Sequence, residues 1–241
     1  MKIAVITPYY KESLEVLRQC HESVAMQETQ VDHFLIADGH PNDAVSKWNA
    51  KHIILSDSHG DNGNTPRGIG SLLAQAEGYD FIAFLDADNW FYPNHITSLL
   101  DLYQKTKAEV CTSLRSIHDL DGIKLDIEEL NDLSLKHIDT SCFMLHQNAF
   151  AVLDIWLKMP KELSPICDKI FLAAIKNKRY RIATTKQKSV GFRSQYKEHY
   201  VAANIEPPLN FKEDVQVEPI QWLRTLTGVK ETVEKLGFYP A

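Results

Sequence analysis

The feature that most constrains the fold is an alternation of short apolar runs with helix-compatible stretches in the first half of the chain. Each apolar run has the length of a strand and ends in polar or turn-forming residues. Strands that alternate with helices form a mostly parallel sheet with both faces covered. Right-handed crossovers then bring the carboxyl ends of the strands to one edge, where the polar segments should converge. The predicted strands are 3–7, 34–37, 52–55 and 81–85, and the predicted helices are 12–26, 42–50 and 68–77.

The second half is less regular, so we expect a main domain, 1–205, and a C-terminal extension, 206–241, that begins near Pro207-Pro208. The extension should carry an amphipathic helix, which can pack within the chain or against a second copy in a homodimer. The other predicted elements are helices at 94–106, 147–158, 165–177 and 219–236, strands at 108–114 and 141–145, a hairpin near 121–122, and short strands with an aromatic-rich loop at 180–200.

The composition excludes several classes of protein. The 241 residues include 44% hydrophobic and 24% charged residues, as in an ordinary globular protein. The net charge of −6 argues against a nucleic-acid partner, which requires a basic face. Four cysteines without a C-x-x-C pair predict buried free thiols rather than disulfides or a zinc site. No apolar run reaches about 18 residues and no signal peptide is recognisable, which predicts a cytoplasmic protein without a membrane span; peripheral membrane association stays compatible with this.

Two carboxylates, Asp86 and Asp88, directly follow the apolar run 81–85. Such residues commonly cap the turn after a strand. Paired carboxylates beside a core are nevertheless costly unless they hold a cation. Close oxygen ligands suit Mg²⁺ or Mn²⁺, which are often bound together with substrate phosphates.

Three further strand ends carry candidates for a nucleotide site. The loop from Asp61 to Gly70 contains glycines and Arg67 before a helix, an arrangement that suits phosphate but lacks the Walker A and dinucleotide spacings. Its alternative is a surface loop with a helix cap. Thr7-Pro8-Tyr9-Tyr10 and Asp38-Gly39 follow the first two strands. Together an aromatic ring and a carboxylate can form a nucleoside site, although each alone is commonly a turn former or a core-edge residue.

Two candidates lie in the second half. Asp168, near the start of a helix, either caps the helix or acts as a general base. The segment 189–200 mixes cationic, aromatic and hydroxyl groups that suit a lid over an anionic ligand. Its His199 is either structural or a contact to a metal or diphosphate.

The ordered set of these motifs resembles the GT-A-fold glycosyltransferases, specifically the inverting family 2, over about residues 2–175. The resemblance rests on Thr7-Pro8-Tyr9, Asp38-Gly39, Gly63 to Arg67, and above all Phe84-Leu85-Asp86-Ala87-Asp88. It implies an α/β GT-A fold with a mostly parallel central sheet, a nucleotide-binding half at 1–90 and an acceptor half at 91–205. The implied activity is hexosyltransferase-like and uses a UDP- or GDP-linked sugar with Mn²⁺ or Mg²⁺.

The resemblance also implies roles for single residues. Asp88 would bind the metal, with His199 as a second candidate ligand, and Asp168 would deprotonate an acceptor hydroxyl. The chain departs from the family pattern at Cys167, where Glu is usual, at Asp38-Gly39-His40, where Asp-Asp-Gly-Ser is commoner, and at Gly68, where Asn is typical. The residues implied to bind the nucleotide-sugar are Thr7, Pro8, Tyr9, Asp38, Gly63, Arg67, Asp86, Ala87 and Asp88.

Two other functions stay open at this point. A sugar-phosphate nucleotidyltransferase shares the sheet and the metal carboxylate, but it normally has a glycine-rich basic loop after the first strand, and residues 7–12 contain no glycine. The other alternative is a domain that binds a nucleotide-sugar without catalysis. The sequence identifies neither the donor sugar nor the acceptor.

Overall fold

The computed structural model describes residues 1–128, 135–213 and 216–240. Its centre is an eight-stranded sheet with the order β3-β2-β1-β4-β7-β6-β8-β5. The pairings within β3-β2-β1-β4 and between β6 and β8 are parallel, and the other three are antiparallel. The strands are β1 (Ile3–Tyr9), β2 (Asp32–Asp38), β3 (Lys51–Leu55), β4 (Phe81–Phe84), β5 (Trp90–Phe91), β6 (Val110–His118), β7 (Phe143–His146) and β8 (Ile182–Arg193).

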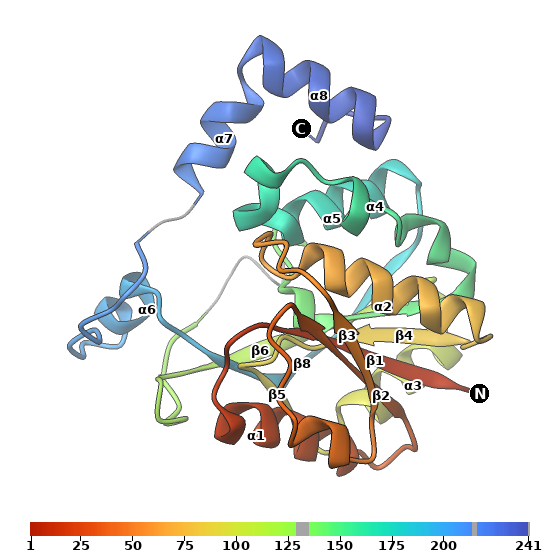
Figure 1. Ribbon diagram of the computed structural model, residues 1–241, viewed down its shortest axis with the longest axis vertical. Helices are drawn as coiled ribbons and strands as arrows, with labels where there is room; N and C mark the ends of the chain where they lie inside the picture. Colours follow the sequence, from red (N-terminus) through yellow and green to blue (C-terminus); the bar gives the residue numbers. More distant parts are fainter. Residues whose placement is uncertain (129–134, 214–215, 241) are drawn as a thin grey trace.

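Helices cover both faces of this sheet (Figure 1). The helices α1 (Leu14–Ala25) and α3 (His95–Thr106) lie on one face, and α2 (Asn64–Ala76), α4 (Ile155–Lys158) and α5 (Cys167–Asn177) lie on the other. Strands β1 and β4 are fully buried, as expected for central strands covered on both faces. Aromatic rings fill the space under α4 and α5, where Trp156 stacks on Phe171 with ring centroids 4.3 Å apart.

Close packing of α2 on the sheet depends on glycine. A Cβ atom at Gly70 would lie 2.7 Å from Cδ1 of Ile36 and 2.9 Å from Cγ2 of Ile6, both fully buried. At Gly68, two residues earlier, it would lie 2.7 Å from the side chain of Leu157. The absence of side chains therefore lets α2 approach both the sheet and α4, which explains locally why Gly rather than Asn follows Arg67.

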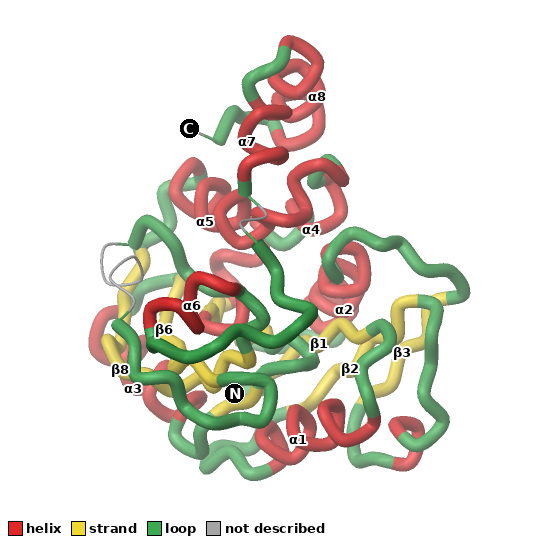
Figure 2. Tube along the Cα trace, turned by 90° about the vertical axis from the view of Figure 1, so that its left-hand side faces the viewer, coloured by secondary structure: helices red, strands yellow, loops and turns green. Residues whose placement is uncertain are grey.

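After β8 the chain forms α6 (Lys197–Ala202) and ends with α7 (Val217–Leu223) and α8 (Leu226–Leu236). Figure 2 shows the last two helices beyond the layer formed by α4 and α5, and α8 contacts α4. Arg224 ends the first helix, and Thr225 begins the second, because its Oγ1 accepts a hydrogen bond from the backbone N–H of Gly228 at 2.9 Å.

The structure corrects several sequence-based boundaries. The helix expected at 42–50 is only the short 3₁₀ helix Val45–Lys47, and the helix expected at 147–158 is the 3₁₀ helix Gln147–Val152 followed by α4. The single helix expected at 219–236 is broken by the Thr225 cap. The short strands expected in 180–200 are one long strand, β8, followed by α6. Residues 129–134, between the hairpin expected near 121–122 and the strand expected at 141–145, lie outside the described residues.

Two expectations from composition can be compared directly with the structure. All four cysteines are free, and all except the partly exposed Cys167 are buried. Within the described ranges, no helix is both long enough and apolar enough to cross a membrane. The boundary between 205 and 206 stays a prediction.

Candidate active site

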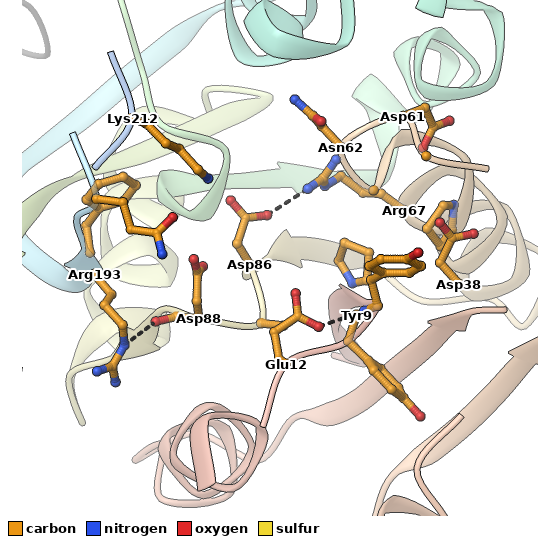
Figure 3. Close-up of a pocket in the computed structure, with 18 of the residues that line it drawn as sticks. Tyr9, Glu12, Asp38, Asp61, Asn62, Arg67, Asp86, Asp88, Arg193 and Lys212 are labelled. Carbon is orange, nitrogen blue, oxygen red and sulfur yellow. Dashed lines mark hydrogen bonds and ion pairs between the residues drawn. The ribbon is translucent and has the colours of Figure 1, made fainter. Parts of the chain in front are cut away.

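A polar cavity of about 490 Å³ opens where the carboxyl ends of β1, β2 and β4 converge, as the alternating pattern predicted. Figure 3 shows the side chains that surround it. They come from the ends of β1 and β2, from the segments that follow β1, β3 and β4, from the start of α2, and from the end of β8 and the segment after it. Of the residues predicted to bind a nucleotide-sugar, the cavity is lined by Pro8, Tyr9, Asp38, Gly63, Arg67, Asp86, Ala87 and Asp88.

The central polar contact in this cavity joins Arg67 to Asp86. A guanidinium nitrogen of Arg67 lies 2.6 Å from Oδ1 of Asp86, and the arginine is almost fully buried. The other face of the guanidinium lies over the ring of Trp156, 4.8 Å from its centroid. Arg67 is thus fixed by packing, and it holds the first carboxylate of the Asp-x-Asp turn.

Asp88 is the acidic centre of the cavity. Its side chain is open to the cavity, while Asp86 and Glu12 lie on the same wall. The surrounding protein raises the pKa of Asp88 to about 7 by desolvation, and the negative charges of Asp86 and Glu12 contribute to the same shift. A positive ligand would therefore stabilise the ionised form of Asp88.

The backbone of the Asp-x-Asp turn is held from both sides. The hydroxyl of Ser141 accepts hydrogen bonds at 3.1 Å from the Asp86 N–H and from the side-chain amide of Asn89. On the other side, Arg193 donates its Nε–H to the carbonyl of Asp88 at 3.2 Å, and its backbone N–H to Oδ1 of Asn89 at 3.1 Å. The buried Asn89 therefore links the turn to Ser141, which lies just before β7, and to Arg193, which ends β8.

The wall away from Asp88 contains Asp38 and Gly63. The Asp38 carboxylate accepts hydrogen bonds from the His59 backbone N–H, and its Oδ1 lies 2.7 Å from Nδ1 of the same residue. Gly63 has φ of +78° and lies against Pro8, whose Cγ would be 3.0 Å from an added Cβ. A left-handed conformation and close packing both favour glycine here.

Thr7 differs from the other predicted nucleotide-binding residues. Its side chain is fully buried, and its Oγ1 lies 2.9 Å from Nε2 of the buried His33. Thr7 does not line the cavity that the described residues enclose. The side chain thus contacts the core, and a role in nucleotide-sugar binding stays a prediction.

A second cavity, of about 210 Å³, adjoins the first and contains Asp168. Oδ2 of Asp168 lies 2.5 Å from Nε2 of His137, and its Oδ1 accepts a hydrogen bond from the Lys169 N–H at 2.7 Å. Burial raises the pKa of Asp168, but the hydrogen bond and charge of His137, the Lys169 N–H and the charge of Arg115 together lower it by more, so the net shift is downward. The carboxylate is therefore ionised at neutral pH.

The second cavity has another acid–base pair and also contains His199. Arg115 donates to Oδ2 of the buried Asp139 at 2.8 Å, although burial still raises the pKa of Asp139 to about 6. Nδ1 of His199 lies 2.7 Å from the hydroxyl of Ser194. Asp88 and His199 line different cavities, and the metal-binding role of each stays a prediction.

Several residues of the two cavities were not identified from the sequence. Most of them lie in segments that the sequence analysis did not connect with a site, although Glu12 follows the candidate segment Thr7-Pro8-Tyr9-Tyr10 by two residues. Asp139 also had an indication, since it caps the turn before the predicted strand at 141–145. These residues are Glu12 and Lys212 in the first cavity, and Arg115, His137 and Asp139 in the second.

A curled mixed sheet between two layers of helices, with a polar cavity beside an Asp-x-Asp turn at the strand ends, defines a protein of the GT-A fold class. Residues 4–150 match the family model described as Glycosyl transferase family 2. The chain therefore belongs to this family of glycosyltransferases, which confirms the resemblance found in the sequence.

Solved structures support the fold. The structure of S. aureus TarS residues 1–349 in complex with UDP has a TM-score of 0.64 and 16% identity, over 96% of this chain and 68% of that one. The same TarS fragment in complex with UDP-GlcNAc gives 0.61 and 16%, over 97% and 73%. The structure of S. aureus TarS itself gives 0.60 and 14%, over 96% and 41%. No curated protein matches the chain.

Proposed function

We propose that this glycosyltransferase transfers a sugar from a nucleotide-diphosphate sugar to an acceptor hydroxyl, with a divalent cation and with inversion at the anomeric carbon. The observation that carries the proposal is the junction of the two cavities. The larger one contains the Asp-x-Asp turn, the smaller one contains Asp168, and Asp86 and Arg67 line both. A donor and an acceptor bound in the two cavities would meet at this shared wall.

The larger cavity suits the donor. Its volume of about 490 Å³ lies in the range of cofactor and ligand sites. Pro8, Tyr9 and Asp38 provide an apolar surface, a ring and a carboxylate at one end, where a base and ribose fit. UDP and UDP-GlcNAc are the ligands in the TarS complexes, which makes a UDP-linked sugar the first donor to test.

The residues of the larger cavity fit a divalent cation. Glu12, Asp86 and Asp88 are three of the carboxylates that line this cavity, and the raised pKa of Asp88 reflects desolvation by the surrounding protein and, next, the negative charges of Asp86 and Glu12. In the described ranges, no group of three or more His, Cys, Asp or Glu residues is arranged to hold a metal alone. Mg²⁺ and Mn²⁺ commonly share one or two carboxylates with substrate phosphates, and Asp88 is the ligand we propose. The cation would neutralise charge on the departing diphosphate.

The smaller cavity suits the acceptor. Asp168 is ionised there and can accept the proton of an acceptor hydroxyl as it attacks the anomeric carbon. Attack from the side opposite the diphosphate would invert that carbon. The separation of Asp88 and Asp168 into two cavities supports different tasks for the two carboxylates.

The two alternative functions make different predictions for ligand binding. A nucleotidyltransferase would bind nucleoside triphosphates together with sugar phosphates. A non-catalytic domain would bind the nucleotide-sugar without turning it over.

Thermal unfolding with a ligand panel tests the proposal, because a ligand that binds only the native state raises the melting temperature. UDP, GDP and their sugar conjugates are compared with and without Mn²⁺. At a ligand concentration about 100-fold above Kd, the expected rise is roughly 5–10 °C for a chain of this size. A rise that requires both a nucleoside diphosphate and Mn²⁺ supports the proposal, and donor consumption then separates an enzyme from a binding domain. A rise only with nucleoside triphosphates would contradict it.

A further inference from the structure

We propose that Lys212 binds the β-phosphate of the nucleotide-sugar and stabilises the departing nucleoside diphosphate. This inference rests on the proposed function and adds a residue outside the matched range 4–150, in the segment that the sequence assigned to the C-terminal extension. Lys212 lines the larger cavity together with the Asp-x-Asp turn. Figure 3 shows its side chain directed toward Asp86.

The backbone of Lys212 is held in place by main-chain pairing. Its N–H donates to the carbonyl of Gln195 at 2.7 Å, and its own carbonyl accepts from the Lys197 N–H at 3.0 Å. These bonds form a parallel bridge between Lys212 and Tyr196. Gln195 and Tyr196 also line the cavity, so the bridge brings the later segment to the wall formed after β8.

The other cationic side chains of this cavity are already hydrogen-bonded or ion-paired to protein groups. Arg67 is paired with Asp86, and Arg193 donates to the carbonyls of Asp88 and Leu120 and to the side chain of Gln19. Over the parts of the chain that the structure describes, the Lys212 ammonium has no hydrogen-bond or ion-pair partner. It is therefore the cationic group of this wall that is available to a ligand without breaking an existing contact.

The position of Lys212 along the cavity indicates which phosphate of the nucleotide-sugar it would bind. Asp38 and Lys212 lie at opposite ends of the cavity in Figure 3, with Asp86 between them. A nucleoside at the Asp38 end would extend its diphosphate toward Lys212, with the β-phosphate nearer to the lysine. An ammonium group is a compact charge suited to phosphate oxygens.

The same placement gives Lys212 a part in the transfer step. When the bond between the anomeric carbon and the β-phosphate oxygen breaks, its electron pair stays on that oxygen. The acceptor oxygen forms the new bond to carbon, and its proton passes to Asp168. A fixed positive group beside the oxygen that gains charge stabilises the transition state more than the ground state.

Calorimetric titration of UDP and UMP in the presence of Mn²⁺ tests the inference, because the two ligands differ in the β-phosphate. Lys212→Met should raise the Kd of UDP at least about tenfold, as expected for the loss of a charged hydrogen bond, and change the Kd of UMP less than about twofold. Lys212→Arg should keep UDP binding within about threefold, because it keeps the charge.

Lys197→Met is the matched control. Lys197 belongs to the same bridged segments, but its ammonium lies over the ring of Phe211, 4.9 Å from the centroid, and Lys197 does not line the cavity. It should leave both Kd values unchanged. Melting temperatures of all three variants should equal that of the wild type, since both lysines are solvent-exposed.

The outcomes separate the two proposals. Equal losses for UDP and UMP in Lys212→Met, or no loss for either, would overturn the role of Lys212 and leave the proposed function standing. If the wild type binds neither UDP nor GDP, the proposed function fails, and the inference fails with it.

Discussion

Asp168 and His137 form an acid–base pair in which Oδ2 of the aspartate lies 2.5 Å from Nε2 of the histidine. The pair joins the first turn of α5 to the segment that precedes Asp139. His137 lowers the pKa of a carboxylate that burial would otherwise raise, so it favours the ionised form that a general base requires. The histidine also restricts the orientation of the carboxylate, which makes His137 a positioning residue in the proposed reaction.

Asp168→Asn should reduce turnover at least about a hundredfold, because general-base assistance contributes typically 10²–10⁴-fold. The binding of UDP with Mn²⁺ should be nearly unchanged, since Asp168 lines the other cavity. Steady-state kinetics and calorimetry on the same preparation measure both. Turnover close to that of the wild type would exclude Asp168 as the base.

His137→Ala should raise the pKa of Asp168 and reduce kcat by about tenfold. Since the base must be deprotonated, the acidic limb of the profile of kcat/KM against pH should move to higher pH. His137→Gln, which keeps a hydrogen-bond donor, should recover part of the loss. A drop in kcat without any shift of this limb would indicate that His137 acts only through the local structure.

Asp88→Asn should remove the stimulation by Mn²⁺ and lower activity at least about a hundredfold, as expected for a metal that contributes several kcal/mol. Donor consumption is measured across a titration of Mn²⁺. Asp57→Asn, at an exposed carboxylate outside the cavity lining, is the control and should behave as the wild type. A variant at Asp88 that is fully active without metal would contradict the assignment.

Stability should fall in acid because of His95. This residue is fully buried between Phe91 and Ser189, and burial lowers its pKa to about 3. An unfolded histidine titrates near 6.5, so the unfolded chain binds the additional proton, and the free energy of unfolding decreases as the pH falls below about 6.5.

Denaturant unfolding at pH 7.5 and pH 5.0 measures this effect. From proton linkage, His95 should account for about 2 kcal/mol of the decrease in the free energy of unfolding between these two pH values. His95→Gln should remove that part of the decrease. His40→Gln, at an exposed histidine, should leave the loss unchanged. An equal loss in His95→Gln and the wild type would show that His95 does not carry the effect.

The first half of the fold could be predicted because β1, β2 and β4 are covered on both faces, while β3, at the edge of the sheet and only partly buried, still contains an apolar run. The runs 3–7, 34–37, 52–55 and 81–85 correspond to β1 to β4, with boundaries within two residues. Such strands are nearly continuous in apolar character, and this signal does not depend on distant residues. The helix expected at 42–50 had no comparable apolar stripe, and only a 3₁₀ turn forms there.

The candidate site also contains residues that could be predicted from the sequence and residues that could not. Four predicted residues each belong to a polar segment that follows a predicted strand, so a parallel topology predicts that they lie close together. These residues are Asp38, Arg67, Asp86 and Asp88. Lys212 and His137 reach the cavities through main-chain bridges and side-chain pairs over long sequence separations. A single sequence does not encode such neighbours as a local pattern.

The hydroxyl of Ser141 has a consequence for how the protein is made. It holds the turn at Asp86 and Asn89 across sequence separations of 55 and 52 residues. During synthesis, at about 5–20 residues per second, both aspartates leave the ribosome several seconds before this hydroxyl is available. The nascent chain thus carries the acidic turn for that interval without the contact that orders it, and β7 must join β4 before the turn reaches its final geometry.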